Sequence, residues 1–243
     1  MLQASEDRTQ EASLPVLRPL AELPGSLALR VYLALKEAIL TLRCRPGAVL
    51  RKPEICAALG VSRSPVSEAL ARLAAEHLVD VVPQAGTFVA RLAMSEIREG
   101  AFLREALELA AVERVADTIT DAQLVQLRRN LRLQAAMIED NDFAGFYTSD
   151  AAMHGLILSF TGFRRVPMLA ESAWLHVNRA RQLLLPAPGR LRATLAEHQA
   201  IVAALQARDP AAARAATRLH LSRLLTALEP LARSRPDLFS PEE

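Results

Sequence analysis

The stretch that most constrains this chain is Leu59–Leu78, which has the pattern of a turn followed by a helix. Gly60 is typical of a helix end, because glycine adopts positive φ at little cost. A new helix begins at once: Ser62 or Ser64 can cap its free amides, and Pro65 falls in its first turn, where no hydrogen bond is lost. Apolar residues at three- or four-residue steps then predict a buried stripe of Val66, Leu70, Leu73 and Leu78. The stretch predicts the turn and second helix of a helix-turn-helix.

The opposite face of that helix is small, polar and basic. It comprises Ser62, Arg63, Ser64, Ser67 and Arg72. A face of this size and charge can enter the major groove of DNA with the N-terminal end of the helix toward the bases. The same spacing is also typical of a helical hairpin with a solvated basic face, so spacing alone leaves both interpretations open.

A β-hairpin is predicted directly after this helix. Val79–Val82 is a short β-type run, residues 83–86 have turn chemistry, and Thr87–Arg91 resumes a strand pattern. A hairpin in this place would be the wing of a winged helix-turn-helix, which favours DNA as the partner. The expected DNA contacts are Arg51, Lys52, Ser62, Arg63, Ser64, Ser67, Arg72, Gln84 and Gly86.

Short motifs across residues 26–92 sharpen this prediction. They are Arg45-Pro46-Gly47, Leu59-Gly60-Val61-Ser62-Arg63-Ser64-Pro65-Val66, Glu68-Ala69-Leu70 and Gly86-Thr87-Phe88-Val89. Together they resemble the winged-helix domain of GntR-type transcription regulators. The chain departs from that family at Ser67, where an arginine is usual, and at His77, where a glycine is usual. We expect a homodimer to bind a pseudo-palindromic double-stranded DNA operator, because one recognition helix reads only a few base pairs.

Charge is distributed unevenly along the chain. The net charge is only +2, but residues 26–92 carry nine Lys and Arg against five acidic residues, whereas residues 93–243 carry eighteen of each. The positive excess therefore lies in the predicted DNA-binding domain, where it would neutralise phosphates. A structural DNA-packaging protein would be far more basic, so that function is disfavoured.

Cysteine placement and the distribution of apolar residues indicate the cellular compartment of the protein. Cys44 and Cys56 are neither closely paired nor near a histidine cluster, which argues against a disulfide framework and a zinc finger. No apolar run is long and uncharged enough for a membrane span, and the first twenty residues lack the features of a signal peptide. We therefore expect a cytoplasmic protein. Residues 1–25 are expected to form a flexible arm and residues 233–243 a flexible tail.

Residues 95–232 look entirely helical. Breakers divide them into six predicted helices: 95–118, 121–140, 143–160, 166–185, 190–208 and 210–231, with Ser95 and Asp209 as caps. Short loops favour an antiparallel bundle, whose interior often binds ligands. The chain is thus predicted to be mainly α, with an N-terminal winged helix-turn-helix and an all-α antiparallel helical bundle.

Histidine placement is the informative feature of the predicted bundle. Asp150 and His154 are four residues apart and share a helix face, while His198 and His220 lie on two further helices. Residue type and spacing leave two interpretations open: three separate histidines satisfied by backbone or solvent, or a common metal site.

Four motifs bear on that choice: Asp150-x-x-x-His154, Glu197-His198-Gln199-Ala200-Ile201, Asp209-Pro210-x-x-Ala213 and His220-Leu221. Across residues 97–230 they resemble the FCD effector domain of the FadR-like GntR subfamily. The resemblance implies that Asp150, His154, His198 and His220 bind one metal ion, and Arg104 with Glu108 matches the Arg-x-x-x-Glu pattern of its first helix. These ligands suit zinc, nickel, iron or manganese, and we expect zinc.

An incoming small carboxylate, such as an organic or sugar acid, could complete the metal shell. Arg104, Arg179 and Arg181 are the expected effector-binding arginines, because a guanidinium fork matches a carboxylate. Trp174, His176 and Asn178 are further candidates, and ordinary salt bridges are the alternative for each arginine.

The function expected is a DNA-binding regulator controlled by this effector. The alternative is a metal-dependent enzyme with its active site in the bundle. No Glu-x-x-His or His-Glu-x-x-His arrangement occurs, which disfavours di-iron and zincin chemistry.

Overall fold

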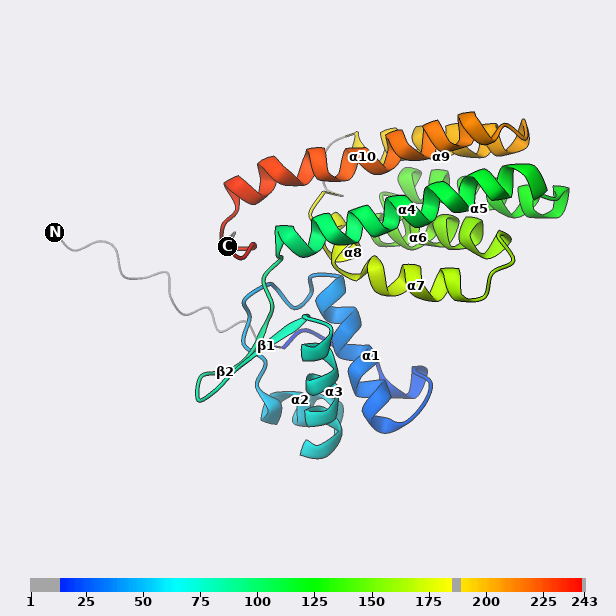
Figure 1. The fold of residues 1–243 in the computed structure, drawn as a ribbon. Helices are drawn as coiled ribbons and strands as arrows, with labels where there is room; N and C mark the ends of the chain where they lie inside the picture. The colour runs from blue at the N-terminus through cyan, green and yellow to red at the C-terminus, as the bar shows by residue number, and fades with distance from the viewer. Residues whose placement is uncertain (1–13, 185–188, 242–243) are drawn as a thin grey trace. The chain divides into compact units, whose positions relative to one another are not determined.

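The computed structural model describes residues 14–184 and 189–241 of the 243-residue chain. These residues divide into two compact units, shown with their elements in Figure 1. The first unit contains the described residues up to Leu92 together with Arg235–Pro241, and the second is Ala93–Ser234. The predicted flexibility of residues 1–13 and of the last two residues lies outside the described residues.

The first unit is a winged helix-turn-helix, as predicted. Helix α3 packs against α1 and α2, and Val66, Leu70, Leu73 and Leu78 are all buried as the apolar stripe requires. Its elements are η1 (Leu20–Glu22), α1 (Leu27–Leu40), α2 (Lys52–Leu59), α3 (Arg63–Ala75), β1 (Val79–Val82) and β2 (Gly86–Val89).

Left-handed backbone conformations occur just before and just after α3. Gly60 ends α2 with φ of 64°, the left-handed conformation expected for it. Ser62 is the N-cap of α3, but its side chain makes no capping hydrogen bond. After α3, His77 has φ of 55°. This conformation explains why glycine is usual there, since a residue with a Cβ is strained by about 1–2 kcal/mol.

The wing is an antiparallel hairpin of β1 and β2, in which Val79 pairs with Val89 and Val82 with Gly86. An isolated antiparallel bridge joins Val49 to Phe88, so the segment before α2 also pairs with the wing. Gln84 lies in the turn with φ of 61° and is exposed.

The segment 14–25 differs from the predicted flexible arm. Leu17 and Leu23 are buried, and the Arg43 Nη1 donates a hydrogen bond of 2.9 Å to the carbonyl oxygen of Val16. Helix η1 packs against α1. The two leucines find apolar partners on the folded unit, which the mixed charge and prolines of this segment did not reveal.

The C-terminal segment also differs from the predicted flexible tail. Arg235–Pro241 belongs to the first unit, where Phe239 is buried and forms a parallel bridge with Leu92. The Leu92 amide donates to the Leu238 carbonyl at 3.0 Å, and the Ser240 amide donates to the Leu92 carbonyl at 2.9 Å. The segment therefore adds a short strand-like edge directly after the wing.

Phe239→Ala should destabilise the winged-helix unit by about 3 kcal/mol, because it removes a large buried ring. Urea unfolding of the full chain, followed by circular dichroism, measures the change. Phe163→Ala is the control, since Phe163 is about half exposed (52%). Equal losses for the two variants would contradict the role of Phe239 in this unit.

The second unit is the predicted helical bundle, with one correction. The single helix expected over 166–185 is two helices in its described part, which meet at Trp174. This break buries the Trp174 ring with Ala111, Leu158 and Ala170. The helices are α4 (Met94–Thr118), α5 (Asp121–Glu139), α6 (Phe143–Phe160), α7 (Arg165–Ala173), α8 (Leu175–Arg181), α9 (Arg190–Gln206) and α10 (Pro210–Ser234).

Two predicted caps have different outcomes. Ser95 lies within α4, whose N-cap is Ala93. Asp209 does cap α10, because its Oδ1 accepts a 2.9 Å hydrogen bond from the Ala212 amide.

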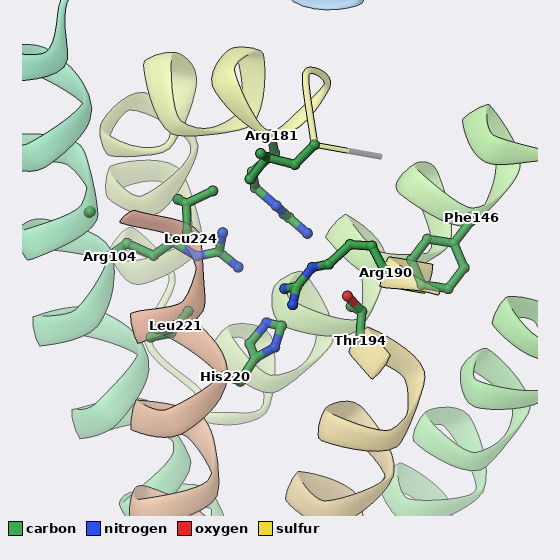
Figure 2. Close-up of a pocket in the computed structure, with 10 residues that line it drawn as sticks. Arg104, Phe146, Arg181, Arg190, Thr194, His220, Leu221 and Leu224 are labelled. Carbon is green, nitrogen blue, oxygen red and sulfur yellow. The ribbon is translucent and has the colours of Figure 1, made fainter. Parts of the chain in front are cut away.

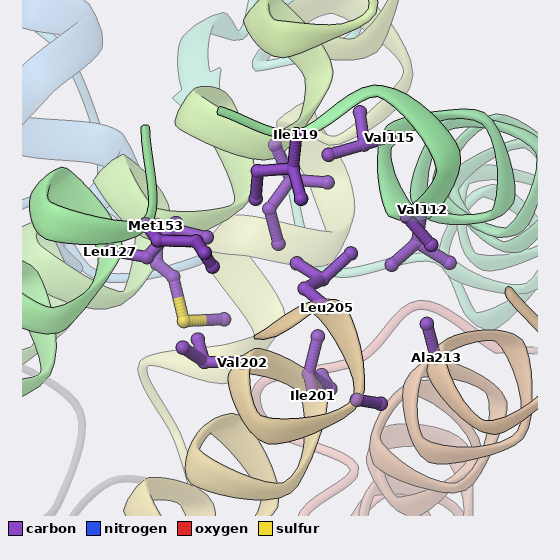
Figure 3. Close-up of a cluster of buried hydrophobic side chains, with 13 residues drawn as sticks. Val112, Val115, Ile119, Leu127, Met153, Ile201, Val202, Leu205 and Ala213 are labelled. Atoms are coloured by element: carbon purple, nitrogen blue, oxygen red, sulfur yellow. The ribbon is translucent and has the colours of Figure 1, made fainter. Parts of the chain in front are cut away.

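The apolar core of the second unit joins five helices (Figure 3). Its labelled residues are Val112, Val115 and Ile119 near the end of α4, Leu127 from α5, Met153 from α6, Ile201, Val202 and Leu205 from α9, and Ala213 from α10. Gly100 lets α4 approach its neighbours closely, since a Cβ there would lie 2.7 Å from the Ala173 carbonyl oxygen. Among the described residues, no helix has the length and apolar character of a membrane span.

Candidate metal centre and DNA-binding surface

Three buried imidazoles meet inside the second unit. His154 comes from α6, His198 from α9 and His220 from α10, and one ring nitrogen of each lies within 4.8 Å of the others. The Nε2 atoms of His154 and His220 are 3.3 Å apart. The structure thus brings together the three histidines that the sequence placed on separate helices.

Asp150 lies beside them, one helical turn before His154 on α6. Its side chain is fully buried, and its Oδ1 is 3.4 Å from the Nε2 of His198. Its Oδ2 accepts a hydrogen bond from the Nη2 of Arg181 at 2.5 Å. The carboxylate therefore has one oxygen turned to the imidazoles and one held by an arginine of α8.

The outward nitrogen of each imidazole faces a side-chain oxygen. The Nδ1–oxygen pairs are His154 with Glu108 at 2.6 Å, His198 with Gln134 at 2.8 Å, and His220 with Glu197 at 2.8 Å. Because carboxylate and amide oxygens only accept hydrogen bonds, each Nδ1 carries a proton and donates to its oxygen. In the neutral form of each ring, Nε2 then presents a lone pair toward the centre.

Charges around the cluster favour metal-binding protonation states. Burial opposes ionisation of Glu108, but Arg104 and His154 outweigh it and hold the pKa of Glu108 far below its usual value. Burial similarly opposes ionisation of Asp150, yet Arg181 and His198 keep its pKa far below the usual value. Burial lowers the pKa of His198 well below 6.5 and that of His220 to about 4. The carboxylates are therefore ionised and these two imidazoles neutral at neutral pH, as metal ligands must be.

The buried polar atoms fit a divalent transition metal. Asp150 Oδ1 and His198 Nε2 are both buried without a hydrogen-bond partner, which is costly for polar atoms away from water. Bonds of 2.0–2.1 Å to a tetrahedral ion place neighbouring ligand atoms about 3.3 Å apart. The observed separations of 3.3 Å and 3.4 Å match that edge length.

A small cavity of about 40 Å³ adjoins the cluster at His220. Figure 2 shows the guanidinium groups of Arg104, Arg181 and Arg190 pointing toward it from three helices. A cavity of this size has room for a few water molecules. Its other lining residues are Ala101, Phe146, Leu184, Thr194, Leu221 and Leu224.

Two of the three predicted effector arginines line this cavity. Arg104 also donates from Nε to Glu108 at 2.5 Å, and its guanidinium lies 4.9 Å from the centre of the Trp174 ring. Arg179 is fully buried and is not among the lining residues. The Nδ1 of His176 lies 3.2 Å from a carboxylate oxygen of Glu96, and His176 is not among the residues that line the cavity.

The predicted DNA-binding residues of the winged-helix unit differ in their exposure and in their contacts. Arg72 is stacked over the Tyr32 ring, 3.9 Å from its centre, and Ser67 is half-buried. Arg51 is exposed and pairs with Glu54 at 3.2 Å. The remaining predicted contacts are exposed: Lys52, Ser62, Arg63, Ser64, Gln84 and Gly86.

Sequence reasoning assigned no role to several residues of the centre. Asn130 and Gln134 are buried polar side chains four residues apart, within the apolar stripe that Leu124 and Leu127 begin on α5. That interruption is a signal that sequence inspection can detect. Glu197 and Arg190 carry no comparable local signal, since charged residues are common on helices.

The arrangement defines a class: a two-unit transcription regulator with a winged-helix DNA-binding unit and a helical C-terminal unit. Models of protein families agree with this reading. The model described as bacterial regulatory proteins, gntR family, matches residues 27–89, and the FCD domain model matches residues 99–223. The chain belongs to the GntR family and carries an FCD domain.

Individual relatives support the assignment. An uncharacterized HTH-type transcriptional regulator of Streptomyces ambofaciens is 35% identical, with 86% of this chain and 88% of that protein covered. The HTH-type transcriptional repressor RspR of Escherichia coli is 30% identical, with 88% and 93% covered. The solved structure of E. coli McbR/YncC shares the fold, with a TM-score of 0.74, 24% identity, and 86% and 99% of the chains covered. The chain is thus a DNA-binding transcription regulator and not an enzyme.

Replacing two imidazoles together should abolish metal binding. We expect wild type to bind about one zinc ion per chain and His198→Ala/His220→Ala to bind none at the same site. Added zinc should raise the melting temperature of wild type alone, because an ion at one hundred times its Kd stabilises the native state by about 2.7 kcal/mol. Elemental analysis and thermal unfolding measure both effects.

The control for this prediction is His77→Asn in the winged-helix unit. Asparagine suits the positive φ of that position, so the variant should fold. Equal zinc content in the double variant and the control would contradict a metal site at the cluster.

Proposed function

We propose that the operator affinity of this regulator is controlled by a small carboxylate, an organic or sugar acid, bound at a divalent metal ion in the FCD domain. The ion is held by Asp150, His154, His198 and His220, and we propose zinc. The observation that carries the proposal is the convergence of three Nε2 lone pairs and one carboxylate oxygen beside an arginine-lined cavity.

The charge balance of the site supports an anionic ligand. Four arginines pair with or lie beside three carboxylates: Arg104, Arg181, Arg190 and Arg223 with Glu108, Asp150 and Glu197. The imidazoles of His198 and His220 add no charge when neutral. A divalent ion raises the positive excess further, and a carboxylate that binds both the ion and a guanidinium fork reduces it.

Chain connectivity supplies a route for regulation. The chain enters the FCD domain after Leu92 and leaves it after Ser234, and the two flanking segments pair in the parallel bridge of Leu92 with Phe239. Helices α4 and α10 begin and end at these points, and they also contribute Arg104 and His220 to the site. An effector that prefers one packing of α4 and α10 therefore biases both covalent connections to the winged helix.

We propose that the protein acts as a homodimer on a pseudo-palindromic operator, because one recognition helix reads only a few base pairs. Helices α4 and α7 pack against each other, and each leaves large apolar side chains exposed. These side chains are Phe102 and Leu103 on α4, and Met168 and Leu169 on α7. Exposed apolar residues of this kind are typical of a protein–protein interface.

Arg63→Ala should weaken specific operator binding by about 1–3 kcal/mol, because Arg63 is exposed at the start of the recognition helix where side chains reach base edges. Arg72→Ala should act more evenly over sequences if the exposed Arg72 contacts only phosphate. Fluorescence anisotropy with operator and random duplexes, at several salt concentrations, separates the two behaviours.

Equal affinity of wild type for operator and random DNA at every salt concentration would contradict base reading by α3. Sedimentation of the complex gives its stoichiometry, and one chain per operator would contradict the dimer.

Arg104→Ala should retain operator binding but lose the response to the effector. In wild type, a coupling of about 1–3 kcal/mol would change operator affinity by about 5- to 150-fold. Operator titrations with and without a panel of organic and sugar acids measure this response. Arg128→Ala on the exposed face of α5 is the control and should respond as wild type.

A carboxylate that binds the wild-type FCD domain, yet leaves operator affinity unchanged, would show that the metal is structural. The regulatory mechanism would then be wrong although the metal site would stand.

A further inference from the structure

A buried chain of hydrogen bonds runs along α5 to His198. Asn130 Nδ2 donates to the backbone carbonyl of Ser149 at 2.8 Å, and Gln134 Nε2 donates to Asn130 Oδ1 at 2.7 Å. The Gln134 Oε1 then faces His198 Nδ1 at 2.8 Å. Asn130 and Gln134 are only 6% and 0% exposed, so water does not compete for these bonds.

The direction of this chain is fixed at one end. A backbone carbonyl can only accept, so Asn130 must turn its amide nitrogen toward Ser149 and its oxygen toward Gln134. Gln134 must in turn direct its nitrogen to Asn130 and its oxygen to His198. The opposite tautomer of His198 would need Gln134 to flip and give up its bond to Asn130, which is costly for buried groups.

His198 differs in this respect from the other two imidazoles. Glu108 and Glu197 are carboxylates that accept from His154 and His220 in any rotamer, and arginines pair with both. His198 faces a neutral amide, which accepts only because Asn130 holds it in that orientation. Asp150 already lies 3.4 Å from the other nitrogen of His198, so a neutral partner avoids a second negative charge on this ring.

We propose that Gln134, held by Asn130, is a positioning residue that fixes the tautomer of His198 and so sets the metal affinity of the site. This inference rests on the proposed metal site. Outer partners of metal-bound histidines typically change metal affinity by about 10–100-fold, and we expect a loss of that size when the amide acceptor is removed.

The first experiment is cobalt titration of the metal-free full-length protein, followed by visible absorption. Gln134→Leu should weaken cobalt binding by about 10–100-fold. Gln134→Glu should recover part of the loss, because a carboxylate can accept from His198 but cannot donate to Asn130. Gln126→Leu on the exposed side of the same helix is the matched control and should bind as wild type.

Each result of the titration has one meaning. Wild-type affinity in Gln134→Leu would overturn the inference, and so would an equal loss in the Leu and Glu variants, because packing alone would then account for it. Failure of wild type to bind cobalt would instead overturn the proposed metal site. Far-UV circular dichroism of the metal-free variants checks that they fold.

The second experiment needs no variant at Gln134. Nitrogen-15 shifts of the imidazoles in the metal-free wild-type protein distinguish the two tautomers, and the His198 signals are those missing in His198→Ala. We expect the proton on Nδ1. A proton on Nε2 of His198 would overturn the inference even if the Gln134 variants failed to fold.

Discussion

The close approach of three imidazole rings and one carboxylate in the FCD domain is the interaction on which its polar interior depends. His154 and His220 bring their Nε2 atoms to 3.3 Å, and Asp150 brings a carboxylate oxygen to 3.4 Å from the third imidazole. Neutral imidazole nitrogens and an ionised carboxylate held this close repel one another in a medium of low dielectric constant, and a cation between them would remove that repulsion. The three helices that carry these groups, α6, α9 and α10, share an apolar core with α4 and α5, so the cluster cannot relax by simple expansion.

The outer partners solve a second problem, which is the orientation of each ring. An imidazole presents a lone pair on one nitrogen only when the other nitrogen holds the proton. Glu108, Gln134 and Glu197 come from α4, α5 and α9. Each imidazole is therefore oriented by a side chain from a helix other than its own. Metal binding at the proposed site would thereby be linked to the packing of most of the bundle, and a rearrangement of any one helix would change the geometry offered to the ion.

The parts of the structure that could be predicted depend on residues close together in the sequence, and the parts that could not depend on contacts between distant residues. The recognition helix and the wing follow from local chemistry, such as Gly60 before α3 and the turn residues between β1 and β2. The grouping of Asp150 with the histidines came from resemblance, because spacing alone favoured three separate histidines. The burial of Phe239 beside Leu92 joins residues at opposite ends of the FCD domain, and no local pattern encodes such a contact. The break at Trp174 likewise depends on the ring finding a tertiary cluster.

The position of the FCD domain within the chain bears on the proposed regulation. Residues 93–234 are inserted between two segments of the winged-helix unit, and those segments are hydrogen-bonded to each other through Leu92. A domain joined to a second unit by one covalent connection can change its internal packing with little effect on that unit. The FCD domain is joined at both ends to segments that pair with each other. Any relative displacement of α4 and α10 must therefore be accommodated either within its own core or at the paired segments. Because the core is closely packed and the bridge of Leu92 with Phe239 is short, we expect such a displacement to strain the bridge first.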